Sequence, residues 1–140
     1  MFLLDTNVVS ELRRPDRTDR NVRAWAQNAP ISRFFLSAIS MLEIELGVRR
    51  IARKDGAQGT ILRQWLEGQI LPQFDGRILA IDTPVALRCA ELHVPDPRPE
   101  RDALFAATAL VHGLTVVTRN IDDFKAMGVV LINPWDAQAS

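Results

Sequence analysis

The stretch Met1–Leu12, MFLLDTNVVSEL, begins with four apolar residues and then reaches the carboxylate of Asp5. A short, continuous apolar run is typical of a strand that is buried on both faces. We therefore predict a first strand at Phe2–Leu4. Asp5 either caps the helix that follows or holds a ligand at the carboxyl end of this strand.

Short apolar runs and helical patterns alternate along the rest of the chain. Further strands are predicted at 33–38, 77–82, 114–118 and 129–133, and helices at 21–28, 40–54, 60–71, from 83 to the proline-rich stretch 94–99, at 100–113 and at 120–128. This alternation predicts an α/β fold: a three-layer α/β/α sandwich with a mostly parallel central sheet, in a single domain over residues 1–140. Thr83 is expected to cap its helix ahead of Pro84, and Gly113 to end the helix before the fourth strand.

The composition excludes several classes of protein. The 17 basic and 17 acidic side chains cancel, which argues against bulk electrostatic binding of nucleic acid but leaves room for a local basic face. Cys89 is the one cysteine, so an internal disulfide is impossible, and its helical pattern indicates a buried thiol rather than a nucleophile. No apolar run is long enough to span a bilayer, and the N-terminus lacks a signal-peptide pattern, so we expect a cytoplasmic protein without membrane contact.

Acidic residues follow the predicted strands. Asp5 follows the first, Glu43 is expected in the first helical turn after the second, Asp122 and Asp123 follow the fourth, and Asp102 begins the helix that leads into the fourth. Each has a structural explanation on its own, for example a capping box in which Ser40 is the cap and Glu43 lies three residues later, or an acid that complements the helix dipole.

Taken together, these carboxylates predict a metal site. They lie in apolar surroundings at one edge of a sheet, where they would repel one another unless a cation or raised pKa values relieved the repulsion. Oxygen ligands alone favour Mg²⁺, with Mn²⁺ as a substitute, over Zn²⁺. His93 and His112 are expected to be packing or surface residues. A metal site of this kind points to phosphoryl transfer.

Six stretches, taken in order, identify a family. They are FLLDTNVVSEL, LSAISMLEIELGV, ILPQFDGRILAID, DALFAATAL, LTVVTRNIDDF and VLINPW. Over nearly its whole length the chain resembles a PIN-domain ribonuclease, specifically a VapC-type toxin of the FitB-like branch. The resemblance implies Mg²⁺-dependent endonucleolytic cleavage of RNA, a homodimer, and neutralisation by a cognate VapB-type antitoxin. It also implies a larger toxin–antitoxin complex that binds operator DNA through the antitoxin.

The same resemblance assigns roles to residues. Asp5, Glu43 and Asp102 match the first three acids, with Asp5 and Asp102 as the direct metal ligands and Glu43 as a ligand or a water-mediated contact. The fourth acidic position falls on Asn120 or on Asp123. Four further residues are expected to contact substrate or to make local hydrogen bonds: Thr6, Asn7, Thr118 and Arg119.

Several questions stay open in the sequence. A catalytically silent, PIN-like module that binds a partner or nucleic acid is the alternative function, and Asn120 would be its sign. The RNA target is not encoded in any motif, although arginines at 13, 14, 17, 20 and 23 form a candidate basic surface. The apolar faces around Leu42–Val48 and Trp65–Ile70 belong either to a dimer interface or to the core.

Overall fold

Five parallel strands form the central sheet of the computed structural model, which describes residues 1–137. The last three residues of the predicted domain, 138–140, lie outside the described residues. The strands are β1 (Phe2–Leu4), β2 (Phe34–Ser37), β3 (Ile78–Leu79), β4 (Thr115–Val117) and β5 (Leu131–Ile132). Every strand pair is parallel, which confirms the predicted α/β class.

The order of the strands places a switch point beside β1. The sheet runs β3-β2-β1-β4-β5, so the chain builds outward from β1 on one side and then crosses over to β4 on the other. Leu4 is paired with Val117, so the carboxyl ends of β1 and β4 lie next to each other. In open sheets of this type, ligands bind at such a switch point.

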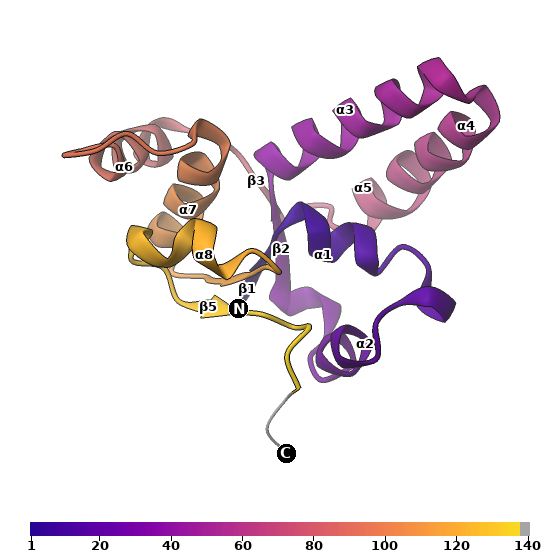
Figure 1. The fold of residues 1–140 in the computed structure, drawn as a ribbon, viewed down its shortest axis with the longest axis horizontal. Helices are drawn as coiled ribbons and strands as arrows, with labels where there is room; N and C mark the ends of the chain where they lie inside the picture. The colour runs from indigo at the N-terminus through magenta and orange to yellow at the C-terminus, as the bar shows by residue number, and fades with distance from the viewer. Residues whose placement is uncertain (138–140) are drawn as a thin grey trace.

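Helices cover both faces of the sheet, as the alternating pattern predicts (Figure 1). The helical segments are α1 (Thr6–Glu11), η1 (Pro15–Arg17), α2 (Arg20–Gln27), η2 (Ile31–Arg33), α3 (Ala38–Lys54), α4 (Gly56–Trp65), η3 (Leu66–Ile70), α5 (Leu71–Gln73), α6 (Thr83–Leu92), α7 (Glu100–His112), α8 (Ile121–Phe124) and η4 (Lys125–Met127). Within residues 1–137, no helix is both long enough and apolar enough to cross a membrane.

Alternate side chains of each strand enter two different cores. On one face Leu4 and Val117 pack with residues of α1 to α4, including Trp25 and Trp65. On the other face Leu3 and Val116 pack against α7 and α8, while α6 packs on α7 through Val85 and Cys89. Two-sided burial explains why the strands read as continuous apolar runs. It also assigns Trp65–Ile70 to the core, because Trp65, Leu66 and Ile70 are buried.

Three local predictions were wrong, and each error concerns where a helix begins. The cap of α3 is Ser37, whose Oγ accepts from the backbone N–H of Ile39 at 3.0 Å, rather than Ser40. There is therefore no capping box, and Glu43 lies in the second turn of α3 instead of the first. Asp82, not Thr83, caps α6 by accepting from the backbone N–H of Val85.

The helix predicted at 60–71 also begins earlier. Its first part, α4, starts at Gly56 behind the capping side chain of Asp55, and the chain continues through a π-helical turn, η3, into α5. The predicted strands 33–38, 77–82, 114–118 and 129–133 are shorter in the structure, most of all the third, which keeps two paired residues. Gly113 ends α7 in a left-handed conformation (φ 66°), as predicted.

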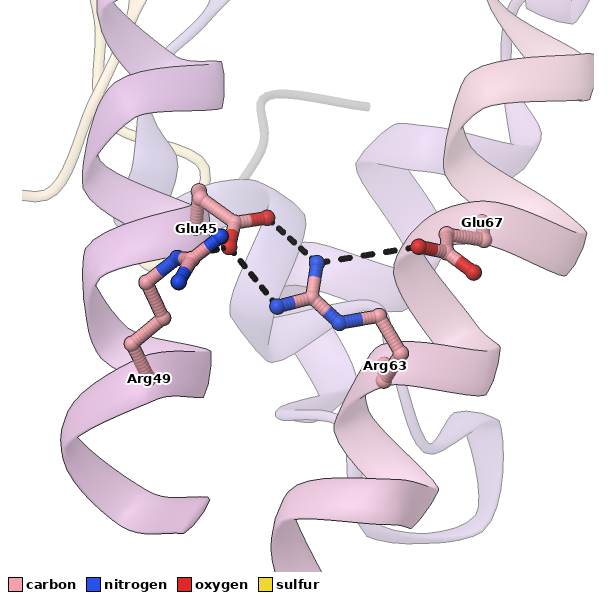
Figure 2. Close-up of polar contacts among 4 residues, drawn as sticks. All are labelled: Glu45, Arg49, Arg63 and Glu67. Atoms are coloured by element: carbon pink, nitrogen blue, oxygen red, sulfur yellow. Dashed lines mark hydrogen bonds and ion pairs between the residues drawn. The ribbon is translucent and has the colours of Figure 1, made fainter. Parts of the chain in front are cut away.

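An ion-pair network joins α3 to α4, the two long helices at the upper right of Figure 1. Figure 2 shows the Glu45 carboxylate of α3 between Arg49 and the Arg63 guanidinium of α4, with Glu67 on the far side of Arg63. Arg63 Nη2 donates to Glu45 Oε2 at 2.7 Å, and Arg63 Nη1 to Oε1. The hydrogen bonds from Arg63 are the largest of the effects that hold the pKa of Glu45 at about 2, against 4.5 normally.

We predict that this network stabilises the protein less and less as the pH falls below 4.5. Because the folded-state pKa of Glu45 is lowered, its contribution is complete above pH 4.5 and is lost as the pH falls toward 2. Arg63→Met should lower Tm by about 1–2 °C at neutral pH, since a partly exposed pair is screened. Thermal melts across pH test this, with Arg88→Met as the control for a pair within one helix. A Tm loss that persists at pH 2 would show that Arg63 acts by packing instead.

Candidate active site

Asp5 lies at the switch point, between the ends of β1 and β4. Its backbone N–H donates to the carbonyl of Val117 at 2.9 Å, which extends the strand pairing by one residue. The hydroxyl of Thr118, the residue after β4, donates to Asp5 Oδ2 at 2.8 Å. Two strand ends that are 113 residues apart in sequence therefore share one carboxylate.

The carboxylate of Asp5 caps the helix that follows, which is one of the two roles that the sequence allowed. Oδ1 accepts from the backbone N–H of Thr6 at 2.8 Å and so caps α1. Oδ2 accepts from Thr118 and, at 3.3 Å, from Asn7 Nδ2. The cap and the Thr118 bond together fix the carboxylate in one orientation, as a ligand-binding group requires.

Thr6 connects Asp5 to Glu43. Its hydroxyl donates to Glu43 Oε1 at 2.8 Å, across 37 residues of sequence. Glu43 lies on α3, which starts directly after β2, the strand next to β1. The predicted first and second acids are thus brought together through a residue that the sequence had marked as a neighbour of the site.

Asp102 and Asp123 complete a group of coupled carboxylates. Asp102 lies in the first turn of α7 and Asp123 in the first turn of α8, as predicted. Burial raises the pKa of Asp102, and the negative charges of Asp123 and Glu43 raise it further. The electrostatic coupling therefore extends from Glu43 through Asp102 to Asp123.

Burial also raises the pKa of Asp5. Hydrogen bonds from Thr118 and from the Thr6 backbone oppose this rise, whereas the charges of Glu43 and Asp102 add to it. Donated hydrogen bonds favour the charged form, but here burial dominates. A cation would relieve the cost of these charges, so the electrostatics of the site favour cation binding.

The segment after β4 also contacts the site through two backbone N–H groups. The N–H of Asn120 donates to Thr118 Oγ1 at 2.9 Å, and the N–H of Arg119 donates to Asn7 Oδ1 at 3.3 Å. The Arg119 guanidinium lies over the Trp135 ring, 5.0 Å from its centroid. The side chains of Asn120 and Asp123 border a common pocket of about 500 Å³.

Arg101 is a neighbour of the site that the sequence analysis missed. Its Nη1 lies 3.8 Å from Glu43 Oε2, so a cation adjoins the carboxylates. The available signal was its position directly before Asp102 in the first turn of α7. Half of the Arg101 side chain is exposed, which leaves the guanidinium accessible to an approaching anion.

The donor set fits Mg²⁺. Asp5, Glu43 and Asp102 offer only oxygen atoms, which hard divalent cations prefer. Within residues 1–137, the oxygen atoms of these three carboxylates do not all lie within 4.8 Å of one another. Mg²⁺ tolerates such a spacing, since it commonly keeps several waters and takes one or two carboxylates directly.

We predict that acidification stabilises the metal-free protein over part of the pH range. The pKa values of Asp5 and Asp102 are raised above 3.8, so the folded state binds more protons than the unfolded state. Tm in EDTA should therefore rise as the pH falls from neutral through these raised values toward 3.8, the opposite sign to Glu45. Melts of the wild type and of Asp102→Asn test this. If both variants lose Tm in parallel from neutral pH downward, the carboxylates are not strained by one another.

Comparisons with known proteins agree with this architecture. The profile of the family described as PIN domain matches residues 2–130. The chain is 41% identical to "Toxin FitB" of Neisseria gonorrhoeae over 96% of this chain and 99% of that protein. It is 38% identical to "VapC ribonuclease Y4jK" of Sinorhizobium fredii over 97% and 99%, respectively.

Solved structures give the same result. "Structure of FitAB bound to IR36 DNA fragment" matches with a TM-score of 0.88 at 38% identity, covering 99% of both chains. "Crystal Structure of FitAcB from Neisseria gonorrhoeae" matches with a TM-score of 0.87 at 40% identity, covering 96% of this chain and 99% of that one. "Toxin-antitoxin complex from Klebsiella pneumoniae" matches with a TM-score of 0.69 at 26% identity, covering 97% and 99%.

Proposed function

Because this chain belongs to the PIN-domain family, as a VapC-type toxin ribonuclease of a type II toxin–antitoxin module, we propose that it hydrolyses RNA phosphodiester bonds at the Asp5 site with Mg²⁺ as cofactor. The observation that carries this proposal is the coupling of Asp5, Glu43 and Asp102 at the switch point of the sheet. Coupled carboxylates with pKa values raised by burial are characteristic of functional sites.

We assign Asp5 and Asp102 as the direct ligands of Mg²⁺, with Glu43 as the third ligand or as a contact through water. When bound, Mg²⁺ supplies a Lewis acid that polarises the phosphodiester and acidifies water. Thr118 and Thr6 hold Asp5 and Glu43 in place through their hydroxyls, each at 2.8 Å. Loss of either hydroxyl would remove a bond that orients Asp5 or Glu43.

The remaining residues position the substrate and move a proton. In hydrolysis, a base takes a proton from the attacking water, whose oxygen bonds to phosphorus. The bond from phosphorus to the leaving oxygen breaks, and the leaving oxygen takes a proton from solvent. We assign the base to Asp123, whose carboxylate is coupled to Asp102. Asn120 then acts through its backbone N–H on Thr118, and Asn7 and Arg119 hold the loop together.

A partner antitoxin restrains this activity in our proposal, and through it the complex binds operator DNA. Its docking site would be the apolar groove of about 380 Å³ beside α1, which includes Leu12, Ile31, Trp65 and Phe74. Ile31 is 48% exposed, and the groove adjoins Arg13, so an apolar segment with an acidic flank would be complementary to it. The active site lies at the other end of α1, so one extended chain can cover both.

Two further features remain proposals. We place the protein in the cytoplasm, where its RNA substrate is found. We also propose a homodimer, and exposed apolar side chains on α3 and α4, namely Leu42, Ile51 and Ile61, are the surface that a second copy would cover.

Total cellular RNA incubated with the purified, antitoxin-free protein tests the function. We expect discrete fragments with Mg²⁺, none with EDTA, and none after addition of the cognate antitoxin. Recovery of cleavage when Mg²⁺ is restored controls for unfolding in EDTA. A folded protein that binds RNA but leaves it intact under all conditions would favour the catalytically silent module and overturn the enzyme assignment.

A further inference from the structure

A second cluster of metal-binding side chains lies away from the carboxylate site, where α6 approaches α7. Cys89 lies on α6, His93 ends that helix, and Glu100 begins α7. One donor atom from each of the three, a sulfur, a nitrogen and an oxygen, lies within 4.8 Å of the other two. Among the described residues, this is the one trio of His, Cys, Asp or Glu side chains with that spacing.

One pair of donor atoms in the trio has nearly the spacing that a tetrahedral site requires. His93 Nε2 lies 3.5 Å from Glu100 Oε2. Two ligand atoms bound to Zn²⁺ at about 2.0–2.1 Å and at the tetrahedral angle lie about 3.3 Å apart. Cys89 and His93 are four residues apart, so both project from the same side of α6.

One atom of this trio is buried without a hydrogen bond. Within residues 1–137, three buried side-chain polar atoms lack a hydrogen bond, and two of them are His93 Nε2 and Arg98 Nε. An unsatisfied buried polar group requires an explanation, such as strain, a catalytic role, or an ion that binds there. The Nε2 atom that makes no hydrogen bond is the same atom that faces Glu100.

We propose that Cys89, His93 and Glu100 form a second metal site, for Zn²⁺ or a divalent ion of similar softness. Thiolate and imidazole ligands suit such ions and not Mg²⁺, so the two sites would not compete for the same metal. Cys89 is 4% exposed, whereas the Glu100 side chain is 72% exposed. The ion would therefore enter from the Glu100 side, and a water would take the fourth position.

Binding displaces protons at this site. The thiol proton leaves to solvent and the ring proton moves from Nε2 to Nδ1, because the sulfur and Nε2 must each offer a lone pair to the metal. In the metal-free state, His93 Nδ1 accepts from the backbone N–H of Arg98 at 3.1 Å, so the neutral ring carries its proton on Nε2. A metal-bound ring normally carries its proton on Nδ1, which breaks the Arg98 bond. We therefore expect a site of moderate affinity whose occupation moves the 94–99 loop.

The site has a consequence for the carboxylate centre. Glu100 and Asp102 share the first turn of α7, so an ion that fixes Glu100 also fixes the turn that carries Asp102. The site would thus clamp α6 to α7 next to the proposed catalytic acids. This inference does not depend on the ribonuclease assignment, since it concerns different donor atoms and a different class of metal.

Titration of the full-length, metal-free protein with Co²⁺ tests the proposal. Cys89 is the one thiol in the chain, so a near-ultraviolet thiolate-to-cobalt charge-transfer band can arise from this site alone. We expect a saturable band that Zn²⁺ abolishes. Cys89→Ala should eliminate the band, and His93→Gln or Glu100→Gln should weaken Co²⁺ binding at least about tenfold.

The controls separate this site from its neighbours. Glu91→Gln, which changes an exposed acid on the same helix, should bind Co²⁺ like the wild type. Asp5→Asn, which alters the carboxylate site, should leave the thiolate-to-cobalt band unchanged. If Cys89→Ala does not fold, Glu100→Gln, which changes an exposed side chain, provides the same comparison. Absence of the band in the wild type, or an undiminished affinity in both His93→Gln and Glu100→Gln, would overturn the proposal.

Discussion

Asp5→Asn is expected to lower the rate of RNA cleavage by about 10³-fold or more while the protein stays folded. The substitution keeps the shape of the side chain, and one oxygen remains to accept from the backbone N–H of Thr6 at the cap of α1. It removes the negative charge that, in our proposal, binds Mg²⁺. A loss of about 4 kcal/mol of transition-state stabilisation corresponds to such a decrease.

A stability measurement separates loss of chemistry from loss of structure. Burial and the charges of Glu43 and Asp102 raise the pKa of Asp5, so the ionised side chain is a cost to the folded state. In EDTA at neutral pH, Asp5→Asn should therefore melt at the same temperature as the wild type or above it. An inactive variant with an unchanged melt identifies a catalytic defect.

The matched control is Asp75→Asn, the same chemical change at an exposed position after α5. It should cleave RNA at the wild-type rate. Mg²⁺ titration of both variants provides a second readout, since only Asp5→Asn should weaken metal binding. Wild-type cleavage by Asp5→Asn would remove this carboxylate from the mechanism.

The fold could be predicted because its local signals agree. Phe2–Leu4 is apolar throughout since both faces of β1 are buried, and Gly113 marks the end of α7 because its backbone has a positive φ. The exact helix starts were less predictable. Ser37 and Ser40 are both reasonable caps in sequence, and the choice depends on where β2 stops pairing with β3, which is a long-range property.

The grouping of the acids was predictable from the sequence, but the hydrogen bonds that orient them were not. Each acid follows a strand or begins a helix, so the parallel topology alone collects them at one edge. The bonds that orient them, from Thr118 to Asp5 and from Thr6 to Glu43, join residues far apart in sequence, and no local pattern encodes such pairs. The Arg119 guanidinium lies over the Trp135 ring, a contact that its position in the motif does not predict.

Asp123→Asn should lower kcat by about 10²-fold or more, whereas Asn120→Asp should change it by less than about fivefold. The sequence left the fourth acidic position open between these two residues. Electrostatics favour Asp123 for the fourth position, because its charge is, after burial, the largest cause of the raised pKa of Asp102. Asn120 is exposed and contacts Thr118 through its backbone N–H. Any residue at this position would provide that N–H. A general base is typically worth 10²–10⁴-fold in rate.

The Mg²⁺ dependence of Asp123→Asn distinguishes a base from a charge that only attracts metal. If Asp123 accepts the proton, Asp123→Asn should stay slow at every Mg²⁺ concentration. If Asp123 merely adds negative charge, excess Mg²⁺ should restore the rate of Asp123→Asn. Asp122→Asn is the control, since Asp122 is the adjacent exposed acid and pairs with Lys125 at 2.7 Å. Should Asp123→Asn cleave like the wild type while Asn120→Asp gains activity, the fourth position belongs to residue 120, and this chain carries an asparagine where its chemistry would work better with an acid.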